Sequence, residues 1–449
     1  KYRSWVQLDT EKSVPIADVY SSTASDAKRR AASRALEWLM KREPEHILRT
    51  KPLVANTEYD EMANTVGDFI KHIRSSESAP EILRSLDKQY YAAFVLKRTS
   101  KDTGKVVAFG IGNRCPDPDH VTEGGETLLD CHALTLARRA LIQYLYGELH
   151  YCLQDSSVTK IRSIFEYADD SLTKFQIKKN VTLHLCLSDS PNGDARDYLP
   201  ADTNSEMNSM QVVQMRTAGH APEFSQPEHG SLKYKLSTGM DTIIADPIQR
   251  YAIMSCSDKI LKWNVLGIQG ALLSNIIEPF KISSITFLSG YKLEHTCRAL
   301  CCRLQNASIE TCMLSSYYTF VNYLGRMKYP LVPEKTIESN FSYSWSLAYQ
   351  GEVIDAVRGK PVTGGMSLLS KLQLFIEYKS ISHQLRRMVS IDSTYYIQKQ
   401  AAKTYQQKKL AMKNYLERQK MGYWSFQKKH LEQFKIQSTV SGIVRNIMC

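Results

Sequence analysis

The chain has 449 residues, 43% of them apolar, which is enough to bury one large core and leave room for a smaller module. No run of about 18 apolar residues occurs and the N-terminus lacks a signal-peptide pattern, so the sequence excludes a membrane-spanning helix and indicates no secretion. Ten irregularly spaced cysteines do not form a disulfide framework, so we expect a nuclear or cytoplasmic protein. Because the chain begins with lysine in mid-pattern, we expect it to be part of a longer protein.

The net charge of +12 is unevenly distributed. Residues 379–435 hold 13 Lys and Arg against 3 Asp and Glu, so the rest of the chain is close to neutral. This segment predicts an anionic partner. Charge alone leaves open whether that partner is a nucleic-acid backbone or a small polyphosphate.

Residues 1–45 have the pattern of two strands and a helix. The β-type runs YRSWVQL and VPIADVY precede the Ala-rich, amphipathic run SDAKRRAASRALEWLMKRE. This order resembles the C-terminal part of a double-stranded-RNA-binding domain, whose last helix begins with a basic patch. The resemblance implies RNA contacts from Lys28, Arg29 and Arg30, although TAS stands where the family has a lysine pair. The alternative is an ordinary amphipathic helix capped by Ser25 or Asp26.

Residues 46–59 are polar and predict a linker, after which helices and strands alternate. The pattern predicts helices over 60–76, 79–90, 132–151 and 259–277, and strands over 90–99, 104–113 and 180–190. Such alternation is typical of an α/β sandwich. Within this part, EHTCRALCCRL places His295, Cys297, Cys301 and Cys302 at helical spacing, which suits a buried helix face or a metal site.

Four stretches carry a family resemblance. They are DCHALTLARRALIQYLY (130–146), LSDSPNGDAR (187–196), MSCSDKILKWNVLGIQGALLS (254–274) and YYIQKQAAKTYQQKKLAMKNYLERQKMGYW (395–424). In this order they resemble the adenosine deaminases acting on RNA, the A-to-I editing enzymes. The resemblance implies a cytidine-deaminase-like, three-layer α/β/α deaminase domain over residues 60–440, preceded by the partial α+β double-stranded-RNA-binding domain.

Two motif positions depart from the family. Its motifs supply one histidine and two cysteines that bind zinc, and a glutamate that transfers protons from the zinc-bound water. His132 and Cys256 match two zinc ligands, but Asn192 stands at the second cysteine position and Leu134 at the glutamate position. Leucine cannot transfer a proton and an amide is a poor zinc ligand, so we expect no catalytic residue, no bound zinc and no enzymatic activity.

The resemblance also implies a buried inositol hexakisphosphate. The matching residues are Arg138, Arg139, Lys259, Lys262, Trp263, Gln269, Tyr395, Lys399, Tyr405, Lys409 and Trp424. On one helix Tyr395, Lys399, Tyr405 and Lys409 would fall within an arc of about 120° and could converge on one ligand. A solvated basic helix face is the alternative. Asn113, Arg114 and Arg196 match positions near the target nucleotide, and Glu228 falls near the base-flipping loop.

We therefore expect a non-catalytic pseudo-deaminase that regulates A-to-I editing or RNA fate. It would bind double-stranded or structured RNA, an active RNA adenosine deaminase as a heterodimer partner, or both, with no membrane partner. One alternative is an active zinc-dependent RNA adenosine deaminase with an altered site. Another is an interaction scaffold that does not bind RNA. The expected location is the nucleus, with the cytoplasm as a second compartment.

Overall fold

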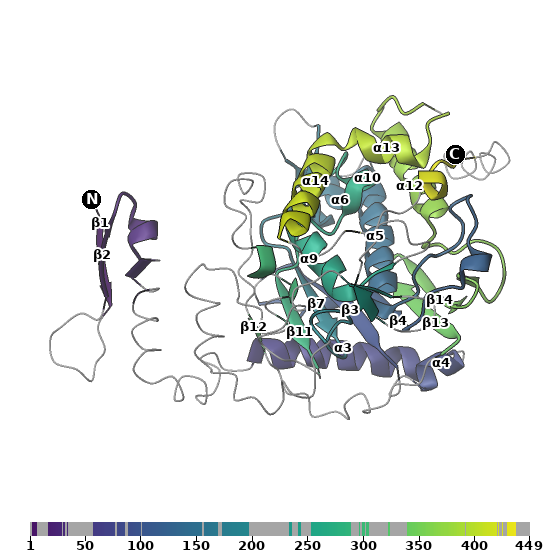
Figure 1. Cartoon of the computed structure of the whole chain (residues 1–449), viewed down its shortest axis with the longest axis horizontal. Helices are drawn as coiled ribbons and strands as arrows, with labels where there is room; N and C mark the ends of the chain where they lie inside the picture. Colours follow the sequence, from purple (N-terminus) through teal and green to yellow (C-terminus); the bar gives the residue numbers. More distant parts are fainter. Residues whose placement is uncertain are drawn as a thin grey trace.

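The structure is a computed structural model. It describes residues 2–6, 17–34, 57–196, 233–235, 241–243, 253–288, 296–304, 322–323 and 339–436, with gaps of one to four residues inside some of these ranges. Figure 1 shows the arrangement of the elements. No helix in these ranges is long and apolar enough to cross a membrane.

The N-terminal residues form the predicted strand, strand, helix order. Strands β1 (Tyr2–Val6) and β2 (Ala17–Ser21) pair antiparallel, and helical residues follow from position 24. Ala27 and Ala31 are buried, whereas Lys28 and Arg30 are exposed. Arg29 and the predicted continuation of this helix lie outside the described residues. The assignment to a double-stranded-RNA-binding domain, and the domain boundaries, stay predictions.

The centre of the domain is an eight-stranded mixed sheet with the order β12-β11-β7-β3-β4-β13-β14-β15. β12, β11 and β7 are parallel to one another, and the pairs from β7 to β15 are antiparallel. The strands are β3 (Tyr91–Lys97), β4 (Lys105–Ile111), β7 (Thr182–Leu187), β11 (Ser284–Phe287), β12 (Asn322–Tyr323), β13 (Phe341–Ser346), β14 (Tyr349–Asp355) and β15 (Lys360–Pro361).

Helices cover both faces of this sheet. α3 (Thr57–Ser75) and α4 (Glu81–Arg84) lie on one face, and α5 (Ala133–Cys152) packs on the other (Figure 1). Alternation along β3 explains both contacts, because Phe94 joins the core under α5 while Val95 joins the core under α3. The predicted three-layer α/β/α deaminase fold is therefore confirmed, although α4 is much shorter than the predicted helix.

A glycine lets α5 lie close to β4. A Cβ atom on Gly110 would lie 2.4 Å from the carbonyl oxygen of Ala133. The amide of Ala133 also donates to the carbonyl of Gly112 at 2.8 Å, joining the end of β4 to the start of α5. This close approach positions the DCHAL motif against the sheet.

Two predicted helices are divided. The helix predicted over 259–277 is found as α9 (Cys256–Leu266) and α10 (Gly270–Leu273), because Gly267 takes a φ of 83° and its amide caps α9 by donating to Trp263. The tail forms α13 (Tyr395–Ala401) and α14 (Lys403–Arg418), which are separated at Ala402 with ψ 65°. The Gln406 side chain donates to the Lys399 carbonyl at 2.8 Å, which satisfies the end of α13.

The remaining elements surround this framework. They are α6 (Ser157–Arg162), α12 (Lys371–Gln384), the β5 (Phe165–Tyr167) and β6 (Phe175–Ile177) hairpin, a small sheet of β8 (Lys233–Lys235), β9 (Asp241–Ile243) and β10 (Ile253–Met254), and the 3-10 turns η2 (Pro118–His120), η3 (Cys302–Leu304) and η5 (Lys429–Glu432).

Five of the ten cysteines are free and buried in the part of the chain that is described. The free, buried ones are Cys115, Cys131, Cys152, Cys186 and Cys256. Of the predicted His–Cys cluster only Cys302 is described, in η3, so the choice between a helix face and a metal site stays open.

Candidate active site and polyanion-binding site

The first, second and third motifs meet in one pocket. It lies where β3 begins, where β4 and β7 end, and where α5 and α9 begin. His132, Leu134, Asn192 and Cys256 all line it, as the motifs predict. The free cavity measures about 50 Å³, which is space for a few water molecules.

His132 stands at the N-cap of α5 and binds a carboxylate. Its Nδ1 lies 2.6 Å from Oδ1 of Asp130, and its backbone amide donates to the same oxygen. The other oxygen of Asp130 accepts from the Thr135 hydroxyl at 2.7 Å and from the Lys259 ammonium. Burial opposes the charge on Asp130, but Lys259 and His132 outweigh it and hold its pKa well below the usual value.

A group of possible metal ligands surrounds His132. The ligand atoms of Cys115, Asp130 and His132 lie within 4.8 Å of one another, and the Cys115 Sγ is 3.7 Å from Nδ1 of His132. Thiolate, imidazole and carboxylate form a donor set that suits zinc. Both oxygens of Asp130 already accept hydrogen bonds, so a metal ion here would have to displace some of these donors. The sequence did not predict this group, and the predicted absence of zinc stays a prediction.

Asn192 has a structural role at its motif position. Its side-chain oxygen accepts from the backbone amide of Cys256 at 2.8 Å, and its carbonyl accepts from Ser257. Ser255 caps the same helix by accepting from the Asp258 amide. The side-chain oxygen of Asn192 is the atom that could ligate a cation, and it already accepts a hydrogen bond from a backbone amide at the N-terminus of α9.

Leu134 is 3% exposed and belongs both to the pocket wall and to the main hydrophobic core. It supplies neither a titratable group nor a hydrogen bond from its side chain. The place of the family's proton-transferring residue is therefore apolar, as the motif predicts.

The predicted RNA contacts are not all in the pocket. Asn113 and Arg196 line it, and the guanidinium of Arg196 lies 4.5 Å from the centre of the Tyr90 ring. Arg196 also pairs with Asp189 at 3.3 Å. Arg114 instead donates to the Asn340 side chain at 2.7 Å. Lys28 and Arg30 lie on the N-terminal helical segment.

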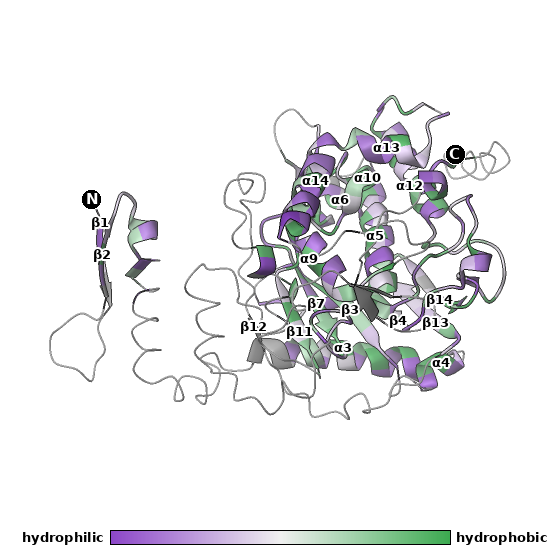
Figure 2. Ribbon diagram, in the orientation of Figure 1, coloured by the Kyte–Doolittle hydropathy of each residue, from purple (hydrophilic) through white to green (hydrophobic). Residues whose placement is uncertain are grey.

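A second cluster, the cation cluster, lies on the outer side of α5. It brings together α5, α9, α12, α13 and α14, and its cations are Arg138, Arg139, Lys259, Lys262, Lys371, Lys399, Lys409 and Lys413. Figure 2 shows α13 and α14 largely in the hydrophilic colour although they pack on the domain. The residues predicted for one helix face thus converge from two helices.

Aromatic rings lie beside these cations. Arg138 is 5.7 Å from the Trp263 ring, Lys262 is 5.2 Å from the Trp424 ring, and Lys399 is 5.3 Å from the Tyr395 ring. Tyr405 lies near the same charges. Burial raises the pKa of its hydroxyl, and the nearby cations Arg138 and Lys399 oppose this rise. Gln269 bonds locally to Leu266, Ser274 and Phe280, so its amide supports the turn between α9 and α10.

Among the residues that the structure describes, two carboxylates pair with cations of this cluster. Lys259 pairs with Asp130, and Lys371 and Lys399 share Glu432 at 3.4 and 2.6 Å. Burial and neighbouring cations lower the pKa of Lys371 and of Lys409 to about 8.

Two half-buried lysines of the cluster show the same effect. Burial and the neighbouring lysines lower the pKa of Lys413 to about 7, and burial and nearby cations hold that of Lys262 well below normal. Cations held close together and partly out of water are stabilised by an anion, so the cluster is suited to a polyanion.

Sequence reasoning missed Lys371, Lys413 and Glu432. Lys371 and Glu432 lie outside the four motif stretches, whereas Lys413 stands one helical turn after Lys409 within the fourth. That spacing was a signal that could have identified Lys413.

A mixed sheet between helix layers, with a histidine at the start of α5 and a capped helix α9 opposite it, defines a deaminase-type domain. Residues 108–428 match the family described as the adenosine-deaminase (editase) domain, and the chain belongs to this family.

Among its relatives is the double-stranded RNA-specific adenosine deaminase of Rattus norvegicus, 32% identical over 413 residues, which cover 88% of this chain and 34% of that protein. The double-stranded RNA-specific editase Adar of Drosophila melanogaster is 32% identical over 344 residues, covering 73% of this chain and 48% of that protein. The double-stranded RNA-specific editase B2 of Mus musculus is 27% identical over 417 residues, covering 91% and 55%. The chain spans about a third of the length of the first of these relatives.

Proposed function

We propose that this chain is a non-catalytic member of the editase-domain family that regulates A-to-I editing or RNA fate by binding structured RNA. Leu134 carries the proposal, because it places a buried apolar side chain where zinc deaminases need a general acid and base. General acid–base catalysis typically contributes about 10²- to 10⁴-fold to a rate, and leucine can supply none of it.

The metal part of the chemistry is weakened as well. Zinc, when bound in such a site, activates the attacking water. At the second cysteine position, Asn192 offers an amide oxygen in place of a thiolate, and that oxygen already accepts from the backbone amide of Cys256. The cavity of about 50 Å³ is also too small for a purine base without rearrangement. We propose that the pocket binds neither zinc nor a flipped adenine.

The cation cluster supports a second part of the proposal. We assign inositol hexakisphosphate to it, since six phosphates would neutralise the clustered, buried or half-buried lysines and arginines. The polyanion would be part of the folded core and would stabilise it by binding the native state.

RNA is the proposed macromolecular partner because the relatives are named for double-stranded RNA. Arg196 and Asn113, at the pocket mouth, are the residues we assign to that contact, together with Lys28, Arg29 and Arg30. An active deaminase as heterodimer partner and a nuclear location remain parts of the same proposal.

One observation favours the alternative of an active enzyme with an altered site. Cys115, Asp130 and His132 could hold a metal ion close to the pocket. Metal analysis of the purified chain separates the two, because an active enzyme retains about one zinc per chain.

The experiment is deamination of a duplex RNA by the full chain with added zinc, read as A-to-G changes after reverse transcription. We expect RNA binding with a steep salt dependence and no inosine. Inosine formation that disappears with His132→Ala would contradict the proposal, and absence of RNA binding at low salt would favour a scaffold.

A further inference from the structure

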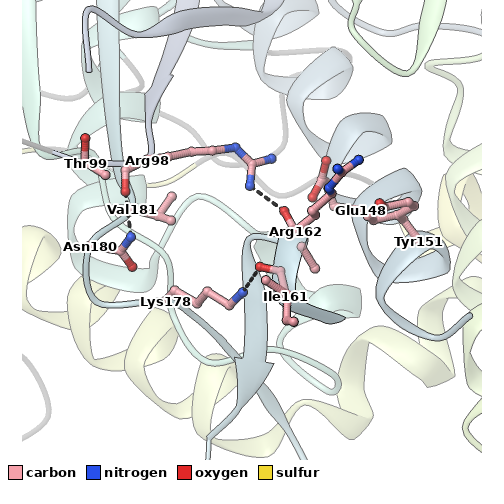
Figure 3. A pocket seen from close by; sticks show the side chains of 10 residues that line it. Arg98, Thr99, Glu148, Tyr151, Ile161, Arg162, Lys178, Asn180 and Val181 are labelled. Atoms are coloured by element: carbon pink, nitrogen blue, oxygen red, sulfur yellow. Dashed lines mark hydrogen bonds between the residues drawn. The ribbon is translucent and has the colours of Figure 1, made fainter. Parts of the chain in front are cut away.

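A second pocket lies at the opposite end of the domain from the deaminase-type pocket. It opens where β3 ends, where β7 begins and where α5 ends (Figure 3). Helix α5 has 20 residues and is therefore about 30 Å long, at about 1.5 Å per residue. This second pocket measures about 680 Å³, within the range of ligand sites, and belongs to neither site described above.

The side chains that line this second pocket carry a net positive charge. Arg98, Arg162 and Lys178 line it together with a single carboxylate, Glu148. The Arg98 guanidinium donates to the carbonyl of Arg162, and the Lys178 ammonium donates to the carbonyl of Ile161 at 2.8 Å (Figure 3). Carbonyl oxygens fix the side chains of Arg98 and Lys178 without cancelling their charge, so an anionic partner would meet two cations that are already ordered.

Apolar side chains adjoin the same cations. Ile161 lines the pocket and is 76% exposed, and Val158 on the same face of α6 is 51% exposed. Tyr151 and Val181 form further parts of the wall. A phosphate backbone would leave the isoleucine and valine in water, whereas a peptide carrying both acidic and apolar side chains would cover them and pair with the cations.

We propose that this pocket is a docking site for a short acidic segment of a partner protein, with its carboxylates at Arg98, Arg162 and Lys178 and an apolar side chain against Ile161. The site would let the chain hold a protein partner at one end of α5, while the other end lies at the pocket whose residues we assign to RNA contact under the proposed function. It does not depend on whether the deaminase-type pocket is active.

The test is selection of a phage-displayed random 12-residue peptide library on the full chain, with the Ile161→Asp and Arg162→Glu double variant as counter-selection. Both positions are exposed, so the variant should fold. Matched controls are Met388→Asp and Arg358→Glu, which introduce the same acidic residues at exposed positions outside the pocket.

We expect enrichment of peptides that combine Asp or Glu with Leu, Ile, Phe or Trp, and at least a ten-fold loss of affinity in the double variant but not in the controls. Equal enrichment on chain and double variant, no enrichment, or enrichment of neutral peptides would overturn the proposal. A labelled 12-nucleotide single-stranded RNA is titrated in parallel. Its binding through Ile161 and Arg162 would also overturn the proposal and indicate a nucleic-acid site.

Discussion

Replacing Lys371 by methionine tests the need of the cation cluster for a polyanion. Lys371 is 7% exposed, lies 3.4 Å from Glu432 and stands near Lys399 and Arg139. Burial and these cations lower its pKa to about 8 from the ordinary 10.5, a difference worth on the order of 3 kcal/mol when the group is charged at pH 7. Glu432 keeps Lys399 as a partner at 2.6 Å, so the variant leaves no unpaired carboxylate.

Without polyanion, Lys371→Met should therefore raise the free energy of unfolding at pH 7 by about 1–3 kcal/mol, as expected when a buried charge is replaced by an apolar side chain. The folded state binds fewer protons than the unfolded state between about pH 8 and 10.5, so the stability of the polyanion-free parent chain rises with pH across this window. The advantage of the variant should shrink in parallel.

Inositol hexakisphosphate should reverse the order of stability, so that the parent chain unfolds with the larger free energy. The parent chain gains stability from ligand binding, about 2.7 kcal/mol at a ligand concentration of 100 Kd, and the variant gains less because it has lost one cation. The assay is urea unfolding followed by tryptophan fluorescence at pH 7 and pH 10, on chain refolded with and without the polyanion. The exposed Lys179→Met is the control. A variant that is less stable than the parent without polyanion, yet gains as much from it, would refute the reasoning.

Three further predictions concern the pocket and its supports. Leu134→Glu combined with Asn192→Cys should restore measurable inosine formation on duplex RNA with zinc, whereas Leu134→Glu alone should not; equal activity of both would contradict the metal argument. Arg303→Met breaks an ion pair with no exposed surface and should lower the free energy of unfolding by about 3–5 kcal/mol, against less than about 1 kcal/mol for the exposed Arg358→Met, both by urea unfolding. Gly110→Ala should lower the thermal midpoint, because its Cβ would meet the α5 backbone at 2.4 Å; an unchanged midpoint would show that α5 can move.

The sequence predicted the fold best where hydrophobic periodicity and motifs agree. The strand runs and the helix after His132 are found almost as predicted, because alternation and helical spacing report burial directly. The division at Ala402 was not predictable from such spacing, since alanine favours helix, and the bond from Gln406 to the Lys399 carbonyl that accompanies the division is seen only in the structure.

Within the candidate sites, motifs identified residues that lie close together in the chain. The pairing of Asp130 with Lys259, and the placement of Cys115 beside His132, need the fold, because these residues come from separate parts of the chain. Periodicity carries no information about which separate elements meet. Glu432 was missed for the same reason.

Leu134 and Asn192, which stand where the family has glutamate and cysteine, make different contacts with the surrounding structure. Leu134 packs in the main core, so a glutamate there would need its own hydrogen-bond partners to be tolerated. Asn192 gives the α9 N-terminus an acceptor, so a cysteine there would remove a hydrogen bond worth about 1 kcal/mol unless a metal ion bound in return. The present residues are thus each favoured by a metal-free pocket, while α9 still presents Lys259 and Lys262 to the cation cluster. The proposed loss of the deamination chemistry is therefore compatible with the proposed stabilisation of the domain by a polyanion at the cation cluster.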